Sequence, residues 1–558
     1  MTTQTAPLAQ PLIASFDIGS SAVKAVLVSR DGQMHLAHTV SYRSSDAVET
    51  ARVEQDPQDW WRAFCEVLQN WWAQGVAKDS MVAITFSGQM QSLIALDAQG
   101  QVLCPAWLHN DARAGAAAAY ITEQIGRDEI HRVTRNPFNA TSVLPKLLHL
   151  REHEPALWAR TERVLMGAKD FIAERLTGRA VCDPTTAATT GVFDIERSTW
   201  AHHWLADLGL KPVLPELLSA DARVGVVSSQ AAALTGLSAG CPVLCGLGDA
   251  AATTLGAGLS DASPCYAYLG TSGWVARVSN KPSSRLNSPG APLFVLPYLA
   301  PAPGQSQESG QTGESGQPAQ PARRILIGPI SNAGAVHRWA LGWLDNASEL
   351  DDVQRYALLE RAVASAPFDA RLMFLPYLNA ERLPVNSRPG QGALIGLSID
   401  TTRAQVMRAA LEGVSLSLRW ALDMLQADAN ADADSDAAPG AAADATPLPT
   451  SRRALIVVGG ATRSAQWMQI LADCFDAPLH IAPDADLLPC LGAAATAALA
   501  LGWCTSPEAF VQQRNRSHFA AALPVVQPLA AAVAQMQAKS IRWRALQAAV
   551  STLSDAPD

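Results

Sequence analysis

Two stretches of the chain share one pattern, in which an apolar run ends at a short turn of glycine and hydroxyl residues and a second apolar run follows. The first is LIASFDIGSSAVKAVLV, residues 12–28, and the second is CYAYLGTSGWVARVS, residues 265–279. When the second is laid on the first, residues 270–272 fall on residues 19–21. Because each copy stands at the head of one half of the chain, we expect a duplicated architecture whose two equivalent hairpin turns face one shared ligand.

The other segments alternate between strand-like and helix-like patterns. Asp31-Gly32 predicts a hairpin turn, and Asp56-Pro57 predicts a helix start, with an N-cap residue followed by proline at the first helical position. We expect strands at residues 12–18, 22–29, 33–41 and 81–87, and helices after residue 57 and at 462–474, 491–502 and 526–550. Such alternation is typical of an α/β chain.

Composition narrows the class of protein. Hydrophobic residues make up 48% of the 558 residues and charged ones 17%, so the chain can bury large cores. A formal net charge of −9 argues against nucleic acid as the main partner. The nine cysteines include no Cys-x-x-Cys pair, and residues 1–10 lack the basic and apolar regions of a secretory signal. The apolar run 491–502 is too short to span a bilayer, so we expect a cytoplasmic protein without a membrane partner.

Two segments have compositions that do not predict packed structure. Residues 301–323 are rich in Gly, Gln, Ser and Pro, and residues 427–452 are a low-complexity mixture of Ala, Asp and Pro. Neither segment carries enough apolar surface to offset the entropy lost on ordering it. We expect both to be loop insertions.

The two glycine–hydroxyl turns have the groups that phosphate oxygens require. Glycine lets the backbone approach closely, while backbone N–H groups and hydroxyls donate hydrogen bonds. The chain contains neither a Gly-x-x-x-x-Gly-Lys-Ser/Thr loop nor a Gly-x-Gly-x-x-Gly helix start after its first strand. Asp17, beside the first turn, suits a magnesium ion held through water. The alternative is an aspartate that only binds the amides of its own turn.

A third feature is Gly-Leu-Gly-Asp, residues 246–249, which follows a strand-like run and precedes a helix of small residues. A carboxylate near a helix N-terminus is favoured by the helix dipole. Asp249 could therefore accept a proton from a substrate hydroxyl that attacks a phosphoryl group. The alternative is an ordinary helix N-cap, for which aspartate is among the preferred residues.

An ordered series of motifs resembles one family, the FGGY carbohydrate kinases, and within it the xylulokinases. The resemblance covers about residues 12–503 apart from the two insertions. It rests on FDIGSSAVKAVLV, FSGQMQSLIALDAQGQVLCPAWLHNDAR, PKLLHLREHEP, GAKDFIAERLTG, GLGDAAATTLGAG, LGTSGW, FLPYLNAERLPVN, ALIGLS, AALEGVSLSLRWALDML, VVGGATRSAQWMQILAD and LGAAATAALALG.

The resemblance implies a two-domain actin/sugar-kinase fold, each domain built on a duplicated ribonuclease-H-like sheet, with an interdomain cleft. The implied N-terminal domain is 1–250 and the C-terminal domain 251–558. The implied activity is transfer of the γ-phosphoryl group of ATP, with Mg²⁺, to a terminal hydroxyl of a small ketose, D-xylulose giving D-xylulose 5-phosphate. Ribulose or arabinitol as acceptor, and a non-catalytic sensor, are the alternatives, and a homodimer is an open possibility.

The resemblance also implies roles for individual residues. Asp249 is the catalytic base, and Asp17 and Asp249 are the residues associated with the metal. The implied sugar-binding residues are Gln89, Met90, Gln91, Asn110, Asp111 and Asp249. The implied nucleotide-binding residues are Gly19, Ser20, Ser21, Lys24, Gly270, Thr271, Ser272, Gly273, Asn332, Gly334, Gly459, Gly460, Ala461 and Ser464.

The sugar-binding motifs depart from the family pattern at two places. Gln91 stands where xylulokinases usually have histidine, and His109 stands where they usually have tryptophan. Glutamine both donates and accepts hydrogen bonds but cannot become a cation. For each residue the alternative is a structural role, as a loop anchor for Gln91 and as a surface or packing residue for His109. The third glycine of the family's adenosine motif is Ala461 here.

Overall fold

In the computed structural model of the chain, the described residues are 10–42, 45–47, 51–259, 265–281, 293–299, 323–342, 352–379, 381, 390–435, 454–518 and 524–554. The chain forms two compact units, each assembled from separate stretches. Unit 1 consists of 1–262, 278–325 and 487–521, and unit 2 of 263–277, 326–486 and 522–558. The unit boundaries fall inside two strands described below, and the single division after residue 250 remains a prediction.

Unit 1 contains a mixed sheet with the strand order β14-β15-β6-β1-β2-β3, and β16 also pairs with β6. Its strands are β1 (Leu12–Ile18), β2 (Ala22–Ser29), β3 (Met34–Ser41), β6 (Met81–Gly88), β14 (Arg223–Val226), β15 (Pro242–Leu244) and β16 (Leu247–Gly248). The expected strands at 12–18, 22–29, 33–41 and 81–87 are confirmed to within one residue. β1 lies at the centre, antiparallel to β2 and parallel to β6.

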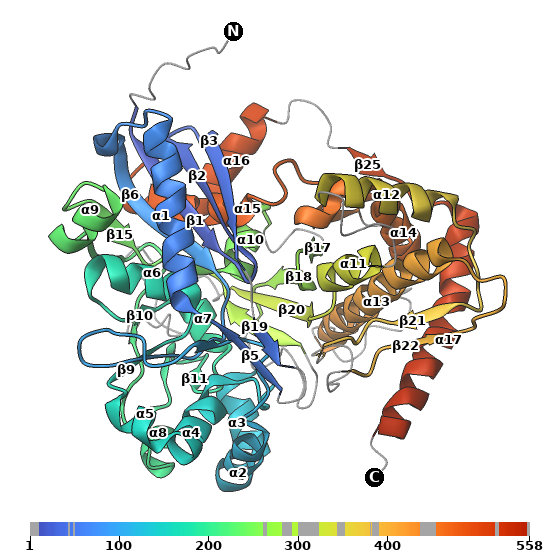
Figure 1. The fold of residues 1–558 in the computed structure, drawn as a ribbon, viewed down its shortest axis with the longest axis horizontal. Coiled ribbons are helices and arrows are strands. Elements are labelled where there is room, and N and C mark those ends of the chain that lie inside the picture. The colour runs from blue at the N-terminus through green and yellow to red at the C-terminus, as the bar shows by residue number, and fades with distance from the viewer. Residues whose placement is uncertain are drawn as a thin grey trace. The chain divides into compact units, whose positions relative to one another are not determined.

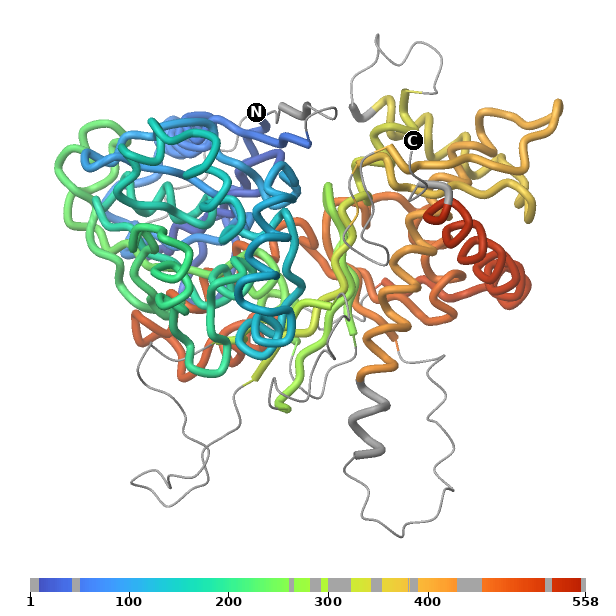
Figure 2. The backbone as a smooth tube through the Cα atoms, turned by 90° about the horizontal axis from the view of Figure 1, so that it is seen from below, coloured from blue at the N-terminus to red at the C-terminus, as the bar shows by residue number. Residues whose placement is uncertain are grey.

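Helices cover both faces of this sheet, which explains why β1 is buried along its whole length. On one face, the Phe16 ring packs 4.6 Å from the Phe64 ring of α1 (Pro57–Ala73). On the other, the Ser15 hydroxyl donates to the Cys490 carbonyl oxygen of α15 (Leu488–Ala500) at 2.7 Å. α15 and the following α16 (Pro507–His518) thus return from near the C-terminus to join the N-terminal strands, as their orange-red colour shows among the blue strands (Figures 1 and 2).

The remaining elements of unit 1 flank this sheet. The helices are η2 (Lys78–Ser80), α2 (Gly115–Ile125), α3 (Arg127–Thr134), α4 (Val143–His153), α5 (Pro155–Arg160), α6 (Ala168–Thr177), α7 (Pro184–Ala188), α8 (His202–Asp207), α9 (Ser229–Thr235) and α10 (Asp249–Gly256). The short strands are β4 (Ser45–Ala47), β5 (Arg52–Gln55), β7 (Ile94–Leu96), β8 (Ala106–Trp107), β9 (Arg163–Leu165), β10 (Val181–Cys182), β11 (Phe193–Asp194), β12 (Thr199–Trp200) and β13 (Glu216–Leu217).

Unit 2 repeats the central arrangement of unit 1. β17 (Tyr266–Leu269) forms an antiparallel hairpin with β18 (Gly273–Ser279) and pairs in parallel with β23 (Leu455–Val458). The sheet continues to β24 (Leu479–Ile481) and β25 (Val525–Val526) on one side, and to β20 (Arg324–Ile330) and then β19 (Phe294–Pro297) on the other. The unit boundaries after residues 277 and 325 fall within β18 and β20. In both units, the first strand of a hairpin with a glycine–hydroxyl turn also pairs in parallel with a strand from later in the chain. The expected duplication is therefore present in the topology.

The other elements of unit 2 are mostly helical. They are α11 (Gly334–Leu341), α12 (Asp352–Ser365), α13 (Arg403–Ser435), η5 (Gly460–Arg463), α14 (Ala465–Phe475), α17 (Ala530–Ser554) and the strand pair β21 (Met373–Leu375) and β22 (Ala393–Ile395). The Trp543 ring of α17 lies edge-on to the Trp420 ring of α13, with 6.3 Å between the ring centroids. None of the helices in the described part of the chain is both long and apolar enough to cross a membrane.

One sequence expectation is wrong in part. Residues 427–435, assigned to a loop insertion, continue α13 as helix. Alanine has the highest helix propensity, and extending an existing helix does not carry the cost of nucleation. The rest of that insertion, 436–452, and residues 301–322 of the other lie outside the described residues. The expected helices at 462–474, 491–502 and 526–550 are present as α14, α15 and α17, with ends shifted by a few residues.

Candidate functional site

Two aspartates predicted to share the chemistry come to the same edge of the unit 1 sheet. β1 and β16 lie on either side of β6 and both run parallel to it. Asp17 is in register with Ser87, and Gly248 is in register with Gly88, so the carboxyl ends of the three strands coincide. Asp17 is the last residue but one of β1, and Asp249 follows β16 directly. Ligands of α/β sheets bind at such carboxyl ends.

Asp17 is held by its neighbouring strands. The Ser87 hydroxyl donates to its Oδ1 at 2.9 Å, and Lys24 is its cross-strand neighbour on β2. Burial raises the pKa of Asp17, while the positive charge of Lys24 and the Ser87 hydrogen bond act in the opposite direction. The carboxylate is therefore costly to keep ionised without a further cation. The alternative, in which Asp17 only binds the amides of its own turn, is not supported, because its hydrogen-bond donor is Ser87 of β6.

The first glycine–hydroxyl turn is braced from behind by three polar side chains. The Gly19 amide closes the turn on the Ala22 carbonyl oxygen at 3.0 Å. The Gly19 carbonyl oxygen accepts from Tyr42 and Gln89, and the Ser20 carbonyl oxygen accepts from Gln55 at 2.6 Å. Ser20 and Ser21 themselves are half-buried. The turn thus directs its carbonyl oxygens into the protein, an orientation that suits an anion on its other side.

Asp249 is the first residue of α10, and the N-cap position belongs to Gly248. Its Oδ1 accepts from the adjacent Ala250 amide at 2.8 Å. The N-cap alternative for Asp249 is therefore wrong, because the N-cap position is one residue earlier, at Gly248. A Cβ on Gly248 would lie 2.2 Å from Met90 Sδ, so Met90 packs directly beside the residue that precedes Asp249.

The residues predicted to bind the nucleotide in unit 2 come from three distant segments and lie together at the carboxyl end of β17. Gly334 donates to the Gly270 carbonyl oxygen at 3.0 Å, and Ala335 donates to the Thr271 carbonyl oxygen at 3.1 Å. Gly459, at φ +98°, approaches β17 so closely that a Cβ would lie 2.5 Å from the Leu269 carbonyl oxygen. The loops at 270–273, 332–334 and 459–461 thus form one contiguous backbone surface.

Two of the predicted nucleotide residues use their side chains inside the protein. Asn332 is fully buried, and its amide binds the backbone of Asn379 and the carboxylate of Glu381. The Ser464 hydroxyl accepts from the Trp467 amide at the start of α14 and donates to Glu360. Both side chains therefore fix the backbone next to the loops.

The predicted sugar-binding residues of unit 1 fall into two groups: some side chains bind other groups within the protein, and others have a buried oxygen without a hydrogen-bond partner among the described residues. Gln91 has φ +62°, is buried, and donates from Nε2 to the Thr141 hydroxyl at 3.1 Å. Asp111 is fully buried, and its carboxylate binds the Arg113 guanidinium and the Val53 amide. By contrast, Gln89 Oε1 and Asn110 Oδ1 are buried without a hydrogen-bond partner among the described residues. These two oxygens are available to a ligand hydroxyl.

His109 does not provide the aromatic surface that the family pattern has at that position, but Trp107 lies two residues earlier. The Arg113 guanidinium lies 4.2 Å from the Trp107 ring centroid, and the His149 ring meets the same tryptophan edge-on at 5.8 Å. Trp107 is 3% exposed, so its ring is packed in the unit rather than offered to a sugar.

Comparisons with known proteins agree with this geometry. A model of the FGGY family of carbohydrate kinases, N-terminal domain, matches residues 12–256, and one of the C-terminal domain matches residues 265–501. The chain belongs to the FGGY family of carbohydrate kinases. It is therefore a phosphotransferase that acts on a carbohydrate, with ATP as the co-substrate of its family.

Curated relatives resemble this FGGY kinase over most of their length. Xylulose kinase of Staphylococcus xylosus is 25% identical over 493 residues, which cover 88% of the chain and 91% of the relative. Xylulose kinase of Escherichia coli K12 is 28% identical over 485 residues, which cover 87% and 89%.

Solved structures support the fold of this FGGY kinase. Ligand-bound xylulose kinase and gluconate kinase of Lactobacillus acidophilus each align with a TM-score of 0.75, at 24% and 23% identity, covering 97% of this chain and 98% of theirs. Glycerol kinase of Plasmodium falciparum with ADP aligns with a TM-score of 0.72 at 17% identity, covering 96% and 98%. The expected actin/sugar-kinase fold with a mixed sheet in each domain is confirmed.

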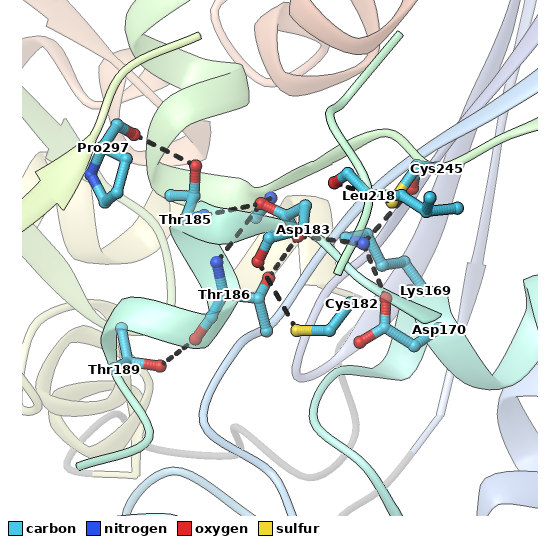
Figure 3. Close-up of polar contacts among 11 residues, drawn as sticks. Lys169, Asp170, Cys182, Asp183, Thr185, Thr186, Thr189, Leu218, Cys245 and Pro297 are labelled. Atoms are coloured by element: carbon cyan, nitrogen blue, oxygen red, sulfur yellow. Dashed lines mark hydrogen bonds and ion pairs between the residues drawn. The ribbon is translucent and has the colours of Figure 1, made fainter. Parts of the chain in front are cut away.

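Sequence reasoning assigned no role to a buried group of charges in unit 1 of the kinase. Lys169, Asp170 and Asp183 are each at most 1% exposed, and the Lys169 Nζ pairs with both carboxylates (Figure 3). The signal was present in GAKDFIAERLTG, since a lysine and an aspartate among apolar residues need buried partners. Unit 2 has a comparable residue, Glu381, whose buried carboxylate binds the Ser331 and Asn332 amides ahead of Gly334.

The residues at the carboxyl edge of β1 fit a magnesium ion. Among the described residues no group of three or more His, Cys, Asp or Glu side chains could hold a metal. Magnesium does not need such a cage, because it keeps several waters and is bound through one or two carboxylates and substrate phosphates. Asp17, on β1, and Asp249, directly after β16, are two carboxylates that would suit this kind of binding.

Proposed function

We propose that this kinase transfers the γ-phosphoryl group of ATP to the terminal hydroxyl of D-xylulose, giving D-xylulose 5-phosphate. The observation that carries the proposal is the position of Asp249, which follows β16 at the carboxyl edge of the sheet and is the first residue of α10. The curated relatives that match most of the chain are named xylulose kinases, which favours this ketose as the acceptor.

In the proposed mechanism, Asp249 accepts the proton of the sugar hydroxyl as its oxygen forms the new bond to the γ-phosphorus. The bond from that phosphorus to the bridging oxygen breaks, and ADP leaves. The position of Asp249 at the N-terminus of α10 favours its ionised form through the helix dipole. Positioning and charge stabilisation supply most of the rate in phosphoryl transfer.

The two glycine–hydroxyl turns hold the phosphates in this proposal. Residues 19–21 and 270–273 present backbone N–H groups and hydroxyls, and residues 459–461 lie against the adenosine. Asp17 and Asp249 would hold magnesium, which when bound neutralises charge on the phosphate oxygens. Gln89 and Asn110 offer their unpartnered oxygens to sugar hydroxyls. Gln91 and Asp111 shape the pocket indirectly, through Thr141 and Arg113.

An ADP-release assay tests the proposal with D-xylulose, D-ribulose, L-ribulose, D-arabinitol, gluconate and glycerol as acceptors. We expect the highest kcat/KM with D-xylulose. Asp249→Asn should keep ATP binding but lower kcat by roughly 10²–10⁴, as expected when a general base is lost. A protein that releases no ADP with any ketopentose would refute the xylulose assignment. Unchanged kcat in Asp249→Asn would refute the mechanism.

A further inference from the structure

We propose that the buried cluster of Lys169, Asp170 and Asp183 is a positioning device that fixes Asp249 for proton transfer. This inference rests on the proposed function, since it assigns the residues that hold the general base rather than a separate activity. None of the three touches the reacting atoms, so they are positioning residues.

The first observation is that the cluster binds both ends of the segment that carries Asp249. The Lys169 Nζ donates to the Cys245 carbonyl oxygen at 3.2 Å, and Asp183 Oδ2 accepts from the Gly248 amide at 3.3 Å. The two anchors are joined by an ion pair of 3.0 Å between Lys169 Nζ and Asp183 Oδ1. The backbone from Cys245 to Gly248 is therefore held at its first and last residues, immediately before Asp249.

The second observation is that only Cys245 and Leu247, both buried, give this segment side chains that can pack. Two of its four residues are glycines, Gly246 and Gly248. A Cβ at Gly246, whose φ is +72°, would lie 2.0 Å from the Phe86 carbonyl oxygen, so no larger residue fits against β6 there. Glycine also has the greatest backbone freedom to lose. At the two glycines, hydrogen bonds to the backbone take the place of side-chain packing in holding the segment.

The third observation is that Asp183 is itself fixed by several donors. It accepts from the Thr185 and Thr186 amides at 3.0 and 3.2 Å, and from the Thr186 hydroxyl at 2.6 Å (Figure 3). That hydroxyl also lies beside Gly248, 3.1 Å from where a Cβ on this glycine would be. Asp183 and Thr186 thus connect the start of α7 to the residue before Asp249.

Stability alone is a weak reason for such a cluster. Removing charges from water costs several kcal/mol per ion, and replacing a buried ion pair by well-packed apolar residues is often neutral or stabilising. Here the charges meet backbone groups of one particular segment, the Cys245 carbonyl and the Gly248 amide. These contacts fix the position of Asp249, and a displacement of a catalytic group by about 1 Å can lower the rate by about 10²-fold.

The test compares Asp183→Asn, Thr186→Val and Thr186→Ser in the full-length chain with D-xylulose and ATP. In Asp183→Asn, the group that faces the Gly248 amide is either the side-chain NH₂, which cannot accept, or the side-chain carbonyl oxygen, which accepts less strongly than a carboxylate. We expect kcat to fall roughly 10–100-fold. Thr186→Val keeps the shape but loses the hydroxyl, and we expect a fall of about five-fold. Thr186→Ser keeps the hydroxyl and should restore most of the wild-type kcat. The KM for ATP and the thermal shift caused by ADP should stay within about two-fold of wild type in all three, because the positioning acts on kcat.

Asp473→Asn is the matched control, since Asp473 is also buried and accepts from a backbone amide, that of Leu529 at 2.8 Å. It should leave kcat unchanged. If Asp183→Asn fails to fold, the Thr186 pair decides. Wild-type kcat in folded Asp183→Asn and Thr186→Val would overturn the positioning role while leaving the kinase assignment intact. Equal losses in Thr186→Val and Thr186→Ser would also overturn it. A wild-type protein that phosphorylates no sugar would overturn the proposed function and this inference together.

Discussion

Gly334 offers a sharp test of whether the loops of unit 2 form the nucleotide site. A Cβ at this position would lie 2.4 Å from the Gly270 carbonyl oxygen and 3.1 Å from its carbonyl carbon. Ordinary van der Waals contact begins at 3.4 Å, so Gly334→Ala must move backbone by roughly 1 Å to reach it. The obstructing atoms are backbone, so rotation of a side chain cannot relieve the clash.

The expected magnitude follows from that displacement. Overpacking a fitted contact usually costs about 1–3 kcal/mol in the free energy of unfolding. A displacement near 1 Å at a phosphate loop should lower kcat/KM for ATP by roughly 10²-fold, because reacting groups lose their alignment. The sugar should still bind, since its predicted residues belong to unit 1.

Steady-state kinetics with ATP varied at saturating sugar, together with a thermal melt, measures both effects. Gly115→Ala is the matched control, because nothing lies within 4 Å of a Cβ there and alanine favours the helix that Gly115 begins. It should match wild type or be slightly more stable. If Gly334→Ala folds and keeps kcat/KM for ATP within two-fold of wild type, the contact between 334 and 270 does not position the nucleotide.

Two further predictions concern stability. Lys539, 2% exposed, pairs with buried Glu412 and donates to the Asp369 carbonyl oxygen at 2.9 Å. Lys539→Met should lower the free energy of unfolding in urea by about 3 kcal/mol, because Glu412 stays buried and keeps, among the described residues, only Arg408 as its ion-pair partner. A loss no larger than that of the exposed-pair control Arg132→Met would contradict this. Burial between Tyr356 and Trp467 lowers the pKa of His337 to about 4 from 6.5. The unfolded state therefore binds the proton more readily than the folded state does. The free energy of unfolding of the wild type should fall by about 3 kcal/mol between pH 6.5 and pH 4, and that of His337→Phe should fall by less. If urea titrations at the two pH values show the same fall for both proteins, the assignment is refuted.

The candidate site shows which structural features local sequence patterns can predict. The strand that contains Asp17 and the helix that begins at Asp249 could be predicted from the sequence, because apolar runs, glycines and hydroxyl turns are local signals. The N-cap alternative for Asp249 could not be settled from sequence, because capping depends on which residue first adopts helical geometry. The loop expected at 427–435 was wrong for a related reason: a low-complexity run was judged without the helix that precedes it.

The roles of individual side chains were less accessible. Gln91 and Asp111 carry groups that suit a sugar, yet the fold commits them to Thr141 and Arg113. Asn332 likewise binds Glu381. Residue type defines which hydrogen bonds a side chain can make, but the neighbours that satisfy them come from distant parts of the chain.

By itself, the sequence determined the strand–turn–strand unit, its repetition, and the family to which the ordered motifs belong, because these depend on residues close together in the chain. Only the tertiary structure decided that Asp17 and Asp249 lie at the carboxyl ends of two strands that both pair with β6, and that Lys169 and Asp183 bind the segment before Asp249. Parallel pairing brings together residues more than 200 positions apart, and a buried charge must find its partner wherever the fold supplies one.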